Sequence, residues 1–342
     1  MSLLVLAAGP GITVQDLGRP GFLAQGLSRG GAADPVALAE GAALLGQDAG
    51  LAAIELAGAP ARFRLTAPAR IALTGTPFRA LLRDPAGESP LAWNASHALP
   101  AGAELALSPL AGGYGYLVPG GGVDAPLRLG ARSAHLAAGI GAALAAGDSL
   151  ALGPDPGTQA ELLIAPLPRD STAPIRVVAS LQTVLFPAAE IARFQRTAFR
   201  RDPRGNRMGL RLDQGDAPGF APFGGLSVVS EIVQPGDIQI TGDGTALVLL
   251  AECQTTGGYP RIATVLPCDL YRVAQAPPGA MLRFQLVGQD EARAAMHAHA
   301  SALAGLRGRI TPRLRDPATM ADLLSYNLVG GVISATAEGS ER

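Results

Sequence analysis

The chain has 342 residues, of which 48% are hydrophobic and 16% are charged, and its formal net charge is −1 at pH 7. This composition allows a large core in one or two domains, and the balanced charge excludes electrostatic attraction to nucleic acid or to an anionic membrane. Lysine is absent, so the chain has no P-loop lysine, no Schiff-base lysine and no biotinyl-lysine.

Two cysteines and four histidines are scattered along the sequence, a distribution that favours neither a disulfide framework nor a metal site. No apolar run reaches the roughly 18 residues of a membrane-spanning helix. The first residues lack the basic segment of a signal peptide, and we therefore expect a cytoplasmic protein.

The first half opens with a predicted strand pair, followed by a polar, glycine-punctuated loop at residues 15–21. In this loop Arg19 has the guanidinium fork that binds a carboxylate or a phosphate, and Gln15 and Asp16 have groups that would orient such an anion. An internal Asp16–Arg19 ion pair that stabilises a turn explains the same residues equally well.

A second glycine-rich loop, residues 28–34, leads into a predicted helix at residues 35–45. Asp34 is the expected N-cap, Pro35 the first helical residue and Gly46 the end of the helix. A glycine-rich segment before a helix N-terminus is also typical of an anion site, which makes Asp34 a candidate site residue.

Residues 53–152 alternate short apolar segments with Gly- or Pro-containing turns about every ten residues, a pattern typical of closed or sandwiched antiparallel sheets. The predicted strands cover residues 53–56, 61–65, 69–73, 78–82, 104–107, 114–118 and 149–152.

A Gly-Pro-Asp-Pro-Gly segment at residues 153–157 is the clearest break in the chain. The order of elements then repeats, with an early helix at residues 187–199 and short strands after it, which indicates a tandem duplication. We expect a first domain at residues 1–155, a second at 174–288 and a helical C-terminal extension at 289–342. In the extension we expect helices at residues 290–306 and from 316 to about 326, with disorder from residue 335.

In the second half, Asn206, Arg207 and Met208 lie at the start of a segment that also contains Arg211. If the segment is extended, both arginines lie on one face and receive an anion together with Asn206; pairing with neighbouring acids is the alternative. Glu231 leaves an apolar strand and is either a site carboxylate or a partner of Arg207.

The least generic stretch is the Gln-Thr-Thr-Gly-Gly-Tyr-Pro loop at residues 254–260, between predicted strands at 245–251 and 261–266. It offers an amide, two hydroxyls and two glycines whose N–H groups can form an anion-binding nest. A plain hairpin turn needs only the two glycines. We expect the backbone of residues 255–258 to face Arg207 across a concave surface.

The candidate substrate-binding residues share polar or backbone groups in these loops. No catalytic nucleophile with an adjacent base, and no metal site, is identified from the sequence. The candidates are Gln15, Asp16, Arg19, Asp34, Asn206, Arg207, Met208, Glu231, Gln254, Thr255, Thr256, Gly257, Gly258 and Tyr259.

The order of the motifs resembles that of a known family. After the loops at residues 15–21 and 28–34 come Arg-Met-Gly-Leu-Arg-Leu at 207–212, the loop at 254–260, and Asp-Leu and Ala-Gln pairs within 269–275. This series resembles the biotin-dependent carboxyltransferase family that includes the C subunit of 5-oxoprolinase, also described as allophanate hydrolase subunit 2 or as KipA-like.

The resemblance implies a mostly β fold of two tandem cyclophilin-like β-barrel domains, with a few short helices and a helical C-terminal tail. It implies a subunit that, with partner subunits A and B, hydrolyses ATP with Mg at the level of the complex and opens 5-oxoproline to glutamate. One alternative is transfer of a carboxyl group to a urea-like amide from biotin on another chain, at a site between the two halves. A non-enzymatic, KipA-like regulatory partner protein is the other.

Two positions depart from the family pattern. Residues 179–182 read Ala-Ser-Leu-Gln where the family usually has a Gly-Pro pair, and Glu252 stands where an aspartate is usual, two residues before Gln254. Glu252 keeps the negative charge and extends the side chain by one methylene.

Overall fold

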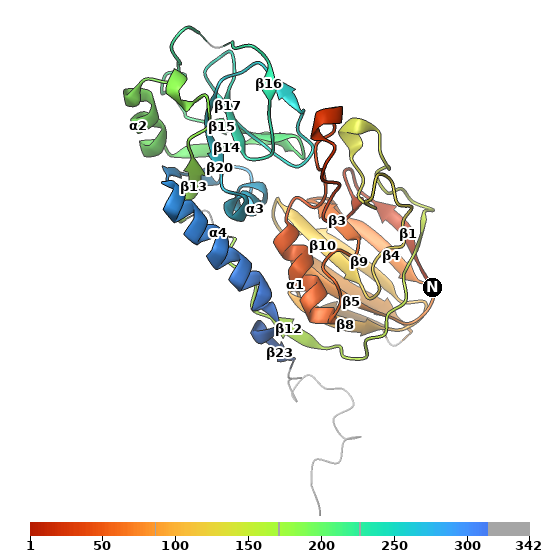
Figure 1. The fold of residues 1–342 in the computed structure, drawn as a ribbon. Coiled ribbons are helices and arrows are strands. Elements are labelled where there is room, and N and C mark those ends of the chain that lie inside the picture. Colours follow the sequence, from red (N-terminus) through yellow and green to blue (C-terminus); the bar gives the residue numbers. More distant parts are fainter. Residues whose placement is uncertain (86, 170–171, 226, 314–342) are drawn as a thin grey trace, which may run out of the picture.

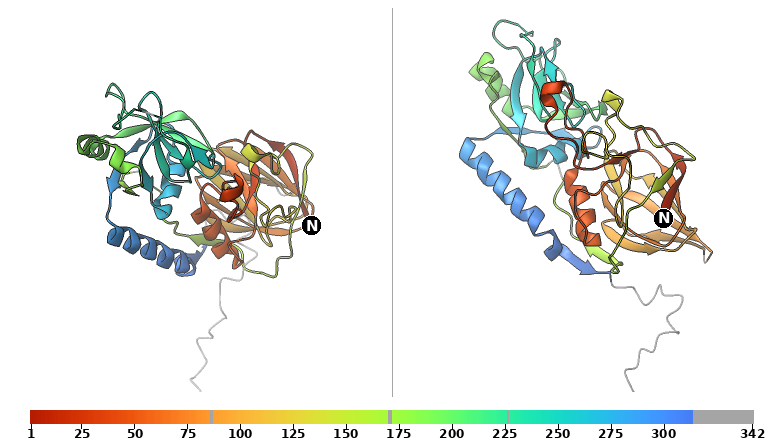
Figure 2. Two further views of the ribbon diagram at one scale, coloured as in Figure 1. Left: turned by 45° about the horizontal axis from the view of Figure 1, so that its top comes forward. Right: turned by 45° about the vertical axis from the view of Figure 1, so that its right-hand side comes forward.

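The computed structural model describes residues 1–85, 87–169, 172–225 and 227–313 (Figure 1). Figures 1 and 2 show two β units side by side, the first coloured red to yellow and the second green to blue, with a long helix that leaves the second unit and returns toward the first. The predicted mostly β class with barrel-like sheets is confirmed. Among the described residues, no helix has both the length and the apolar composition needed to cross a membrane.

The first unit consists of two antiparallel sheets, with strand orders β11-β1-β4-β9-β6-β7 and β2-β3-β10-β5-β8-β12-β23. Alternation of buried and exposed side chains along β4 is typical of strands with one face on a core. The strand bounds are β1 Ser2–Ala8, β2 Thr13–Gln15, β3 Ala53–Ala57, β4 Ala61–Leu65, β5 Ala69–Gly75, β6 Phe78–Asp84, β7 Gly87–Leu91, β8 Ala95–Leu99, β9 Glu104–Pro109, β10 Tyr114–Pro119, β11 Ser149–Ala151, β12 Leu162–Ile164 and β23 Ile310–Pro312.

Helix α1, Pro35–Leu45, has the bounds predicted from its capping residues and packs against the seven-stranded sheet. The carboxylate of Asp34 accepts a hydrogen bond from the Ala37 backbone N–H at 2.9 Å, as an N-cap does. Gly41 allows close packing, because a Cβ atom there would lie 2.5 Å from Val118 Cγ2. The helix N-terminus therefore has a fixed position at one end of this sheet.

The second unit is built on one eight-stranded sheet in the order β21-β14-β15-β18-β17-β20-β13-β22. Its two outermost strands, β21 and β22, are separated in sequence by Arg283 alone, so the sheet nearly closes into a barrel. The remaining bounds are β13 Ile175–Val178, β14 Phe199–Asn206, β15 Gly209–Asp213, β16 Glu231–Ile232, β17 Asp237–Ile240, β18 Ala246–Leu249, β19 Thr256–Gly257, β20 Arg261–Val265, β21 Met281–Leu282 and β22 Phe284–Leu286.

The helices of the second half are short, apart from α4, and their bounds are α2 Ala188–Arg196, α3 Pro267–Gln275 and α4 Gln289–Ala304. Short 3-10 turns cover Leu23–Gln25, Leu136–Ala138, Thr183–Leu185 and Leu306–Arg309. The sequence of residues 267–275 also predicts a short helix, and α3 has these bounds. Helix α2 ends three residues before the predicted helix does, because Phe199 already begins β14.

The segment after α4 returns to the first unit. Strand β23 pairs with β12, and β12 pairs with β8, so the chain returns from the second half to a sheet of the first. Strand β12 lies between the two predicted domains, and the apolar pattern misses it because it has only three residues. The predicted helix at residues 316–326 and the disorder from residue 335 lie outside the described residues.

Four aromatic rings form the centre of the second unit. Phe194 and Phe199 each contact the other three rings of the set, which also includes Phe220 and Phe284, with ring centroids 5.4 to 5.9 Å apart. We expect Phe194→Ala to lower the free energy of unfolding by about 3–5 kcal/mol, because the truncated ring leaves a cavity in a close-packed core. Urea unfolding followed by circular dichroism measures this change.

Leu181→Ala is the matched control, because the Leu181 side chain is 90% exposed and its loss should change the unfolding midpoint little. Equal losses in the two variants would contradict the assignment of the aromatic cluster as the core of the second unit.

Candidate functional site

A cavity of about 250 Å³ lies between the two halves of the chain. Most of its lining is apolar, and its charged side chains are those of Arg29 and Arg207. The first half contributes Leu17, Arg29, Gly30, Ala32, Ala33 and Pro35, and the second half contributes Arg207, Pro235, Leu250, Ala251, Pro267, Leu270, Tyr271 and Ala274. The volume and apolar walls suit a small organic molecule with few polar groups.

The first-half wall consists of the two glycine-rich loops that the sequence singled out, pressed together at backbone level. The N–H of Arg19 donates to the carbonyl of Arg29 at 2.8 Å, and the N–H of Ala32 donates to Asp16 at 2.8 Å. Gly31 has φ +81°, and a Cβ atom there would lie 2.6 Å from the Gly18 nitrogen. Only glycine allows this approach at that backbone angle.

The guanidinium of Arg207 links the two halves behind the cavity. Its Nε donates to Glu252 Oε1 at 2.6 Å, its Nη1 donates to Glu55, and its Nη2 donates to the Gly31 carbonyl at 2.5 Å. Arg207 and both carboxylates are buried. Burial alone would lower the pKa of Arg207, but the two carboxylates outweigh it and raise that pKa, so the group stays charged.

These pairs correct the predicted role of Arg207 as an open anion receptor, because two negative side chains already balance its charge. Arg207 and Met208 form the turn between β14 and β15, so Arg207 does not share a strand face with Arg211. Arg211 pairs instead with Asp243 at 2.5 Å. Asn206 caps the same turn by accepting the Met208 N–H at 2.8 Å.

Glu55 is held in place by more than its arginine. Its Oε2 accepts from the Tyr116 hydroxyl at 2.6 Å and from the Ala33 N–H at 2.8 Å. The Tyr116 hydroxyl in turn accepts from the Asp34 N–H at 2.8 Å. Burial and the neighbouring Glu55 raise the pKa of Tyr116 well above its usual range, so this phenol remains a donor.

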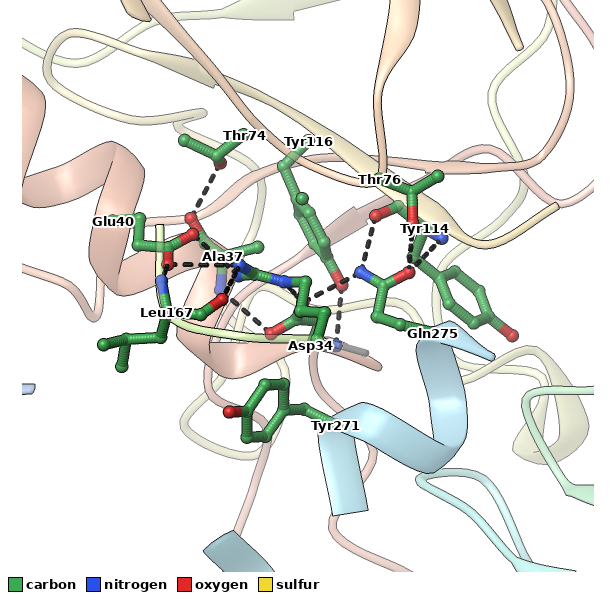
Figure 3. A network of polar contacts seen from close by, with 12 residues as sticks. Asp34, Ala37, Glu40, Thr74, Thr76, Tyr114, Tyr116, Leu167, Tyr271 and Gln275 are labelled. Atoms are coloured by element: carbon green, nitrogen blue, oxygen red, sulfur yellow. Dashed lines mark hydrogen bonds and ion pairs between the residues drawn. The ribbon is translucent and has the colours of Figure 1, made fainter. Parts of the chain in front are cut away.

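Figure 3 shows a second link between the halves, in which Gln275 from α3 lies between Asp34 and Tyr114. Its Nε2 donates to Asp34 Oδ2 and to the Tyr114 carbonyl, both at 2.8 Å. Its Oε1 accepts from the Tyr114 N–H at 2.8 Å and from Thr76 at 2.6 Å. The amide is therefore fully paired, and α3 is fixed against the first-half sheet.

The carboxylate of Asp34 also pairs with Arg169 at 2.6 Å, and Arg169 binds Glu40 at 2.7 Å. Burial raises the pKa of Glu40, and Arg169 acts against that rise. The predicted anion site at this helix N-terminus is wrong, because the Asp34 carboxylate itself occupies it.

The predicted ligands Gln15, Asp16 and Arg19 are buried and hold loops of the first half together. Arg19 donates to the carbonyls of Ser133 and Arg128, and Asp16 accepts from the backbone N–H groups of Gly18 and Arg132 at 2.8 and 2.6 Å. Asp16 and Arg19 thus bind backbone groups instead of forming the alternative ion pair.

Gln15 donates its amide N–H to Thr13 at 2.9 Å and to the Ala134 carbonyl at 3.2 Å. Gln15, Asp16 and Arg19 are absent from the cavity lining, and their contacts give them a structural role.

The Gln-Thr-Thr-Gly-Gly-Tyr-Pro loop adopts a different geometry from the predicted one. Thr256 and Gly257 form β19, which pairs with β16, while the cavity lining from this region ends at Ala251. Residues 255–258 are not part of this cavity lining, and the expectation that they face Arg207 across a concave surface stays a prediction. The side chain that reaches Arg207 is Glu252, just before the loop.

The remaining candidates lie around this ribbon. Glu231 pairs with Arg261 at 2.6 Å and with Gln182 at 2.8 Å rather than with Arg207. Gln254 donates to Gln239 at 3.2 Å. Thr255 is buried, Gly258 lies beside the loop that contains Ser230, and Tyr259 is 43% exposed. Their role in substrate binding stays a prediction.

A Ser28–His135 pair near the cavity escaped the sequence analysis. Ser28 Oγ and His135 Nε2 are 2.8 Å apart, and Glu252 lies 3.9 Å from His135 Nδ1. His135 Nδ1 accepts the Ala138 N–H at 3.3 Å, so a neutral ring has its proton on Nε2 and donates it to Ser28. This tautomer gives Ser28 no base, and the set does not form an activated nucleophile.

Two further residues were missed as functional candidates. Glu55 is a carboxylate in the middle of the apolar strand β3, and a buried charge of this kind demands a partner. That signal was available in the sequence. Arg29 was part of the second loop but was not singled out, because nothing local distinguishes it from a surface arginine.

Comparison with known proteins identifies the family. Residues 25–286 match the model described as "Carboxyltransferase domain, subdomain A and B". The chain belongs to this carboxyltransferase domain family. It is 32% identical over 285 residues to the C subunit of 5-oxoprolinase from Haemophilus influenzae, a match that covers 82% of this chain and 89% of the relative.

The chain is also 34% identical over 306 residues to the C subunit of 5-oxoprolinase from Escherichia coli, which covers 85% of this chain and 93% of that protein. Among solved structures, TTHA0988 matches with a TM-score of 0.74 and 29% identity, over 83% of this chain and 55% of its own. The K. lactis urea amidolyase matches with a TM-score of 0.78 over 92% of this chain and 21% of its own, and at 23% identity it shows the fold. The predicted family is thus confirmed.

We expect Arg207→Ala to lower the free energy of unfolding by about 3–5 kcal/mol, because it leaves Glu55 and Glu252 buried without their counter-charge. Adding Glu252→Gln to this variant should restore part of the loss, since it removes one of the two stranded charges. Arg204→Ala is the control, because the Arg204 side chain is 76% exposed and its loss should change the midpoint little. Wild-type stability of Arg207→Ala would refute the central role of this guanidinium.

His135 makes stability depend on pH. Burial lowers the pKa of His135 below its usual value of 6.5, although Glu252 opposes this shift, so the unfolded chain binds the proton more readily. Its contribution to stability is present above pH 6.5 and is lost as the pH falls through the lower folded-state pKa. We expect His135→Gln to lose less stability than wild type between about pH 7.5 and 5.5.

Urea unfolding at a series of pH values measures this difference. His297→Gln is the matched control, because His297 is exposed on α4 and its replacement should leave the wild-type pH dependence in place. An unchanged slope in His135→Gln would contradict the assignment.

Proposed function

We propose that this chain is the C subunit of an ATP-dependent 5-oxoprolinase, which opens 5-oxoproline to glutamate together with subunits A and B. The observation that carries the proposal is the match to two proteins named as the C subunit of 5-oxoprolinase, over 89% and 93% of their lengths. The cavity between the halves supplies a site of suitable size and polarity.

The cavity lining suits a small lactam. Apolar side chains such as Leu17, Leu250 and Leu270 offer surfaces for the methylene groups of the ring. Arg207, which also lines the cavity, uses one N–H at each nitrogen in its hydrogen bonds to the described residues, and a guanidinium has two N–H groups at each Nη. Because its charge is already balanced, its further N–H groups suit a neutral acceptor such as the lactam oxygen.

Opening the lactam requires water to add to the carbonyl carbon, the ring C–N bond to break and the nitrogen to take up a proton. Ser28, which precedes the lining residue Arg29, has the wrong histidine tautomer beside it for activation. We therefore assign this chain the binding and orientation of the substrate and assign activation to its partners.

We place ATP and Mg on the partner subunits or at their junction with this chain. ATP hydrolysis to ADP and phosphate supplies the driving force for ring opening. A chain without lysine cannot provide the lysine of a P-loop, so phosphate binding of that kind has to come from another subunit.

Carboxyl transfer is the second candidate, and the carboxyltransferase domain match favours it. In that reaction biotin carried by another chain would enter the cavity and pass its carboxyl group to a urea-like amide nitrogen. The same apolar walls and N–H donors would then face the ureido ring of biotin. A complex that consumes carboxybiotin and releases no glutamate would identify this activity.

Reconstitution tests the proposal directly. We expect the purified chain alone to release no glutamate from 5-oxoproline, and the mixture with subunits A and B and ATP to release glutamate and ADP in equal amounts. Glutamate and ADP are measured in the same samples. Omission of each subunit in turn and of ATP gives the controls.

Full activity of the isolated chain would refute the role as a subunit. Absence of glutamate from the complete mixture, with the complex shown to assemble by gel filtration, would refute the proposed reaction.

A further inference from the structure

We propose that Arg29 is the residue that recognises the substrate carboxylate and so selects an amino-acid-derived lactam over a simple lactam. This assignment rests on the proposed function, because it names a specificity determinant of the same cavity. It differs from the sequence-based expectation, which gave anion binding to Arg19 and Arg207.

The charges around the cavity exclude the two expected arginines. Arg19 is 1% exposed and is not part of the lining. Arg207 lines the cavity, but Glu55 and Glu252 already bind it, and an incoming carboxylate would meet two negative charges for one positive charge. A third carboxylate at Arg207 would therefore be repelled.

Arg29 is the other cationic side chain of the lining, and its surroundings differ. Its Nε donates to the Leu17 carbonyl at 2.8 Å, and this is its one side-chain hydrogen bond among the described residues. Both Nη groups are therefore available for a ligand. No aspartate or glutamate occurs among the described residues that line the cavity, so no carboxylate of the lining competes for this guanidinium.

The backbone around Arg29 is fixed on both sides. Its carbonyl accepts the Arg19 N–H at 2.8 Å, and the next residue, Gly30, donates its N–H to Ala251 of the second half at 3.0 Å. Together with the Nε–Leu17 hydrogen bond, these contacts hold the base of the side chain. A guanidinium held at Nε offers its two Nη groups as a planar fork, the geometry that binds a carboxylate through two parallel hydrogen bonds.

The cavity lining thus has two different polar positions among its apolar side chains. Arg29 has a positive charge without a carboxylate partner among the described residues, whereas two carboxylates already offset the charge of Arg207. A ligand that fits both has a carboxylate and a neutral amide on one small apolar ring. 5-Oxoproline has these groups, and 2-pyrrolidinone has the ring and the amide without the carboxylate.

The test compares these two lactams on the reconstituted complex. We expect Arg29→Gln to lower kcat/KM for 5-oxoproline about tenfold or more, mainly through KM, because a charge-assisted contact is lost. The same variant should leave turnover of 2-pyrrolidinone to 4-aminobutyrate unchanged. Where that turnover is too slow to follow, the inhibition constant of 2-pyrrolidinone against 5-oxoproline should be unchanged. Arg29→Lys, which keeps the charge but not the fork, should lie between wild type and Arg29→Gln.

Arg64→Gln is the matched control. Arg64 is a partly exposed arginine on β4, in the six-stranded sheet of the first unit. This variant should behave as wild type with both lactams. Circular dichroism and gel filtration check that each variant folds and joins the complex. The assignment is overturned if Arg29→Gln keeps the wild-type preference for 5-oxoproline, or if it slows both lactams equally. A wild-type complex that assembles but releases no glutamate overturns the proposed function and this assignment with it.

Discussion

The arrangement of the two halves depends on one buried guanidinium shared by two carboxylates. Arg207 belongs to the second half, Glu55 to the first, and Glu252 stands just before the most distinctive loop of the chain. Removing three charged groups from water costs more free energy than a single ion pair regains. Each charged group in the set therefore needs hydrogen bonds as well as its ion pair. The Tyr116 hydroxyl and backbone N–H groups provide this for Glu55. The set therefore specifies how the halves meet more than it adds stability.

Two further contacts also hold the two halves together, at other places in the structure. Gln275 ties α3 to the N-terminus of α1, and β23 ties the end of the described chain to β12 in the first-half sheet. The three links lie on different elements and restrain rotation as well as separation of the halves. The cavity between them is consequently preformed, which lowers the cost of ordering a small ligand there.

Local signals allowed the helices to be predicted well and the site poorly. The Asp-Pro pair that begins α1 and the proline that begins α3 are local signals, so the predicted bounds of both helices match the observed ones. Strand β7 was missed because its sequence, Gly-Glu-Ser-Pro-Leu, has little apolar character and is mostly exposed. Arg207 and Glu55 are 152 positions apart, and no local pattern shows that they meet. Only the charge of Glu55 inside an apolar strand hinted at a distant partner.

Three charged residues that look like ligand contacts in the sequence are paired within the chain for a common physical reason. Buried arginines and carboxylates in glycine-rich loops need partners, and in Arg19, Asp34 and Arg207 the partners come from the chain itself. A recognition charge has to remain unpaired until the ligand arrives, which favours a position at the rim of a cavity over one in the interior. Arg29 meets this condition because its backbone is fixed and its guanidinium edge is not. The exposed guanidinium of Arg29 can therefore bind a ligand, whereas the buried arginines hold the chain together.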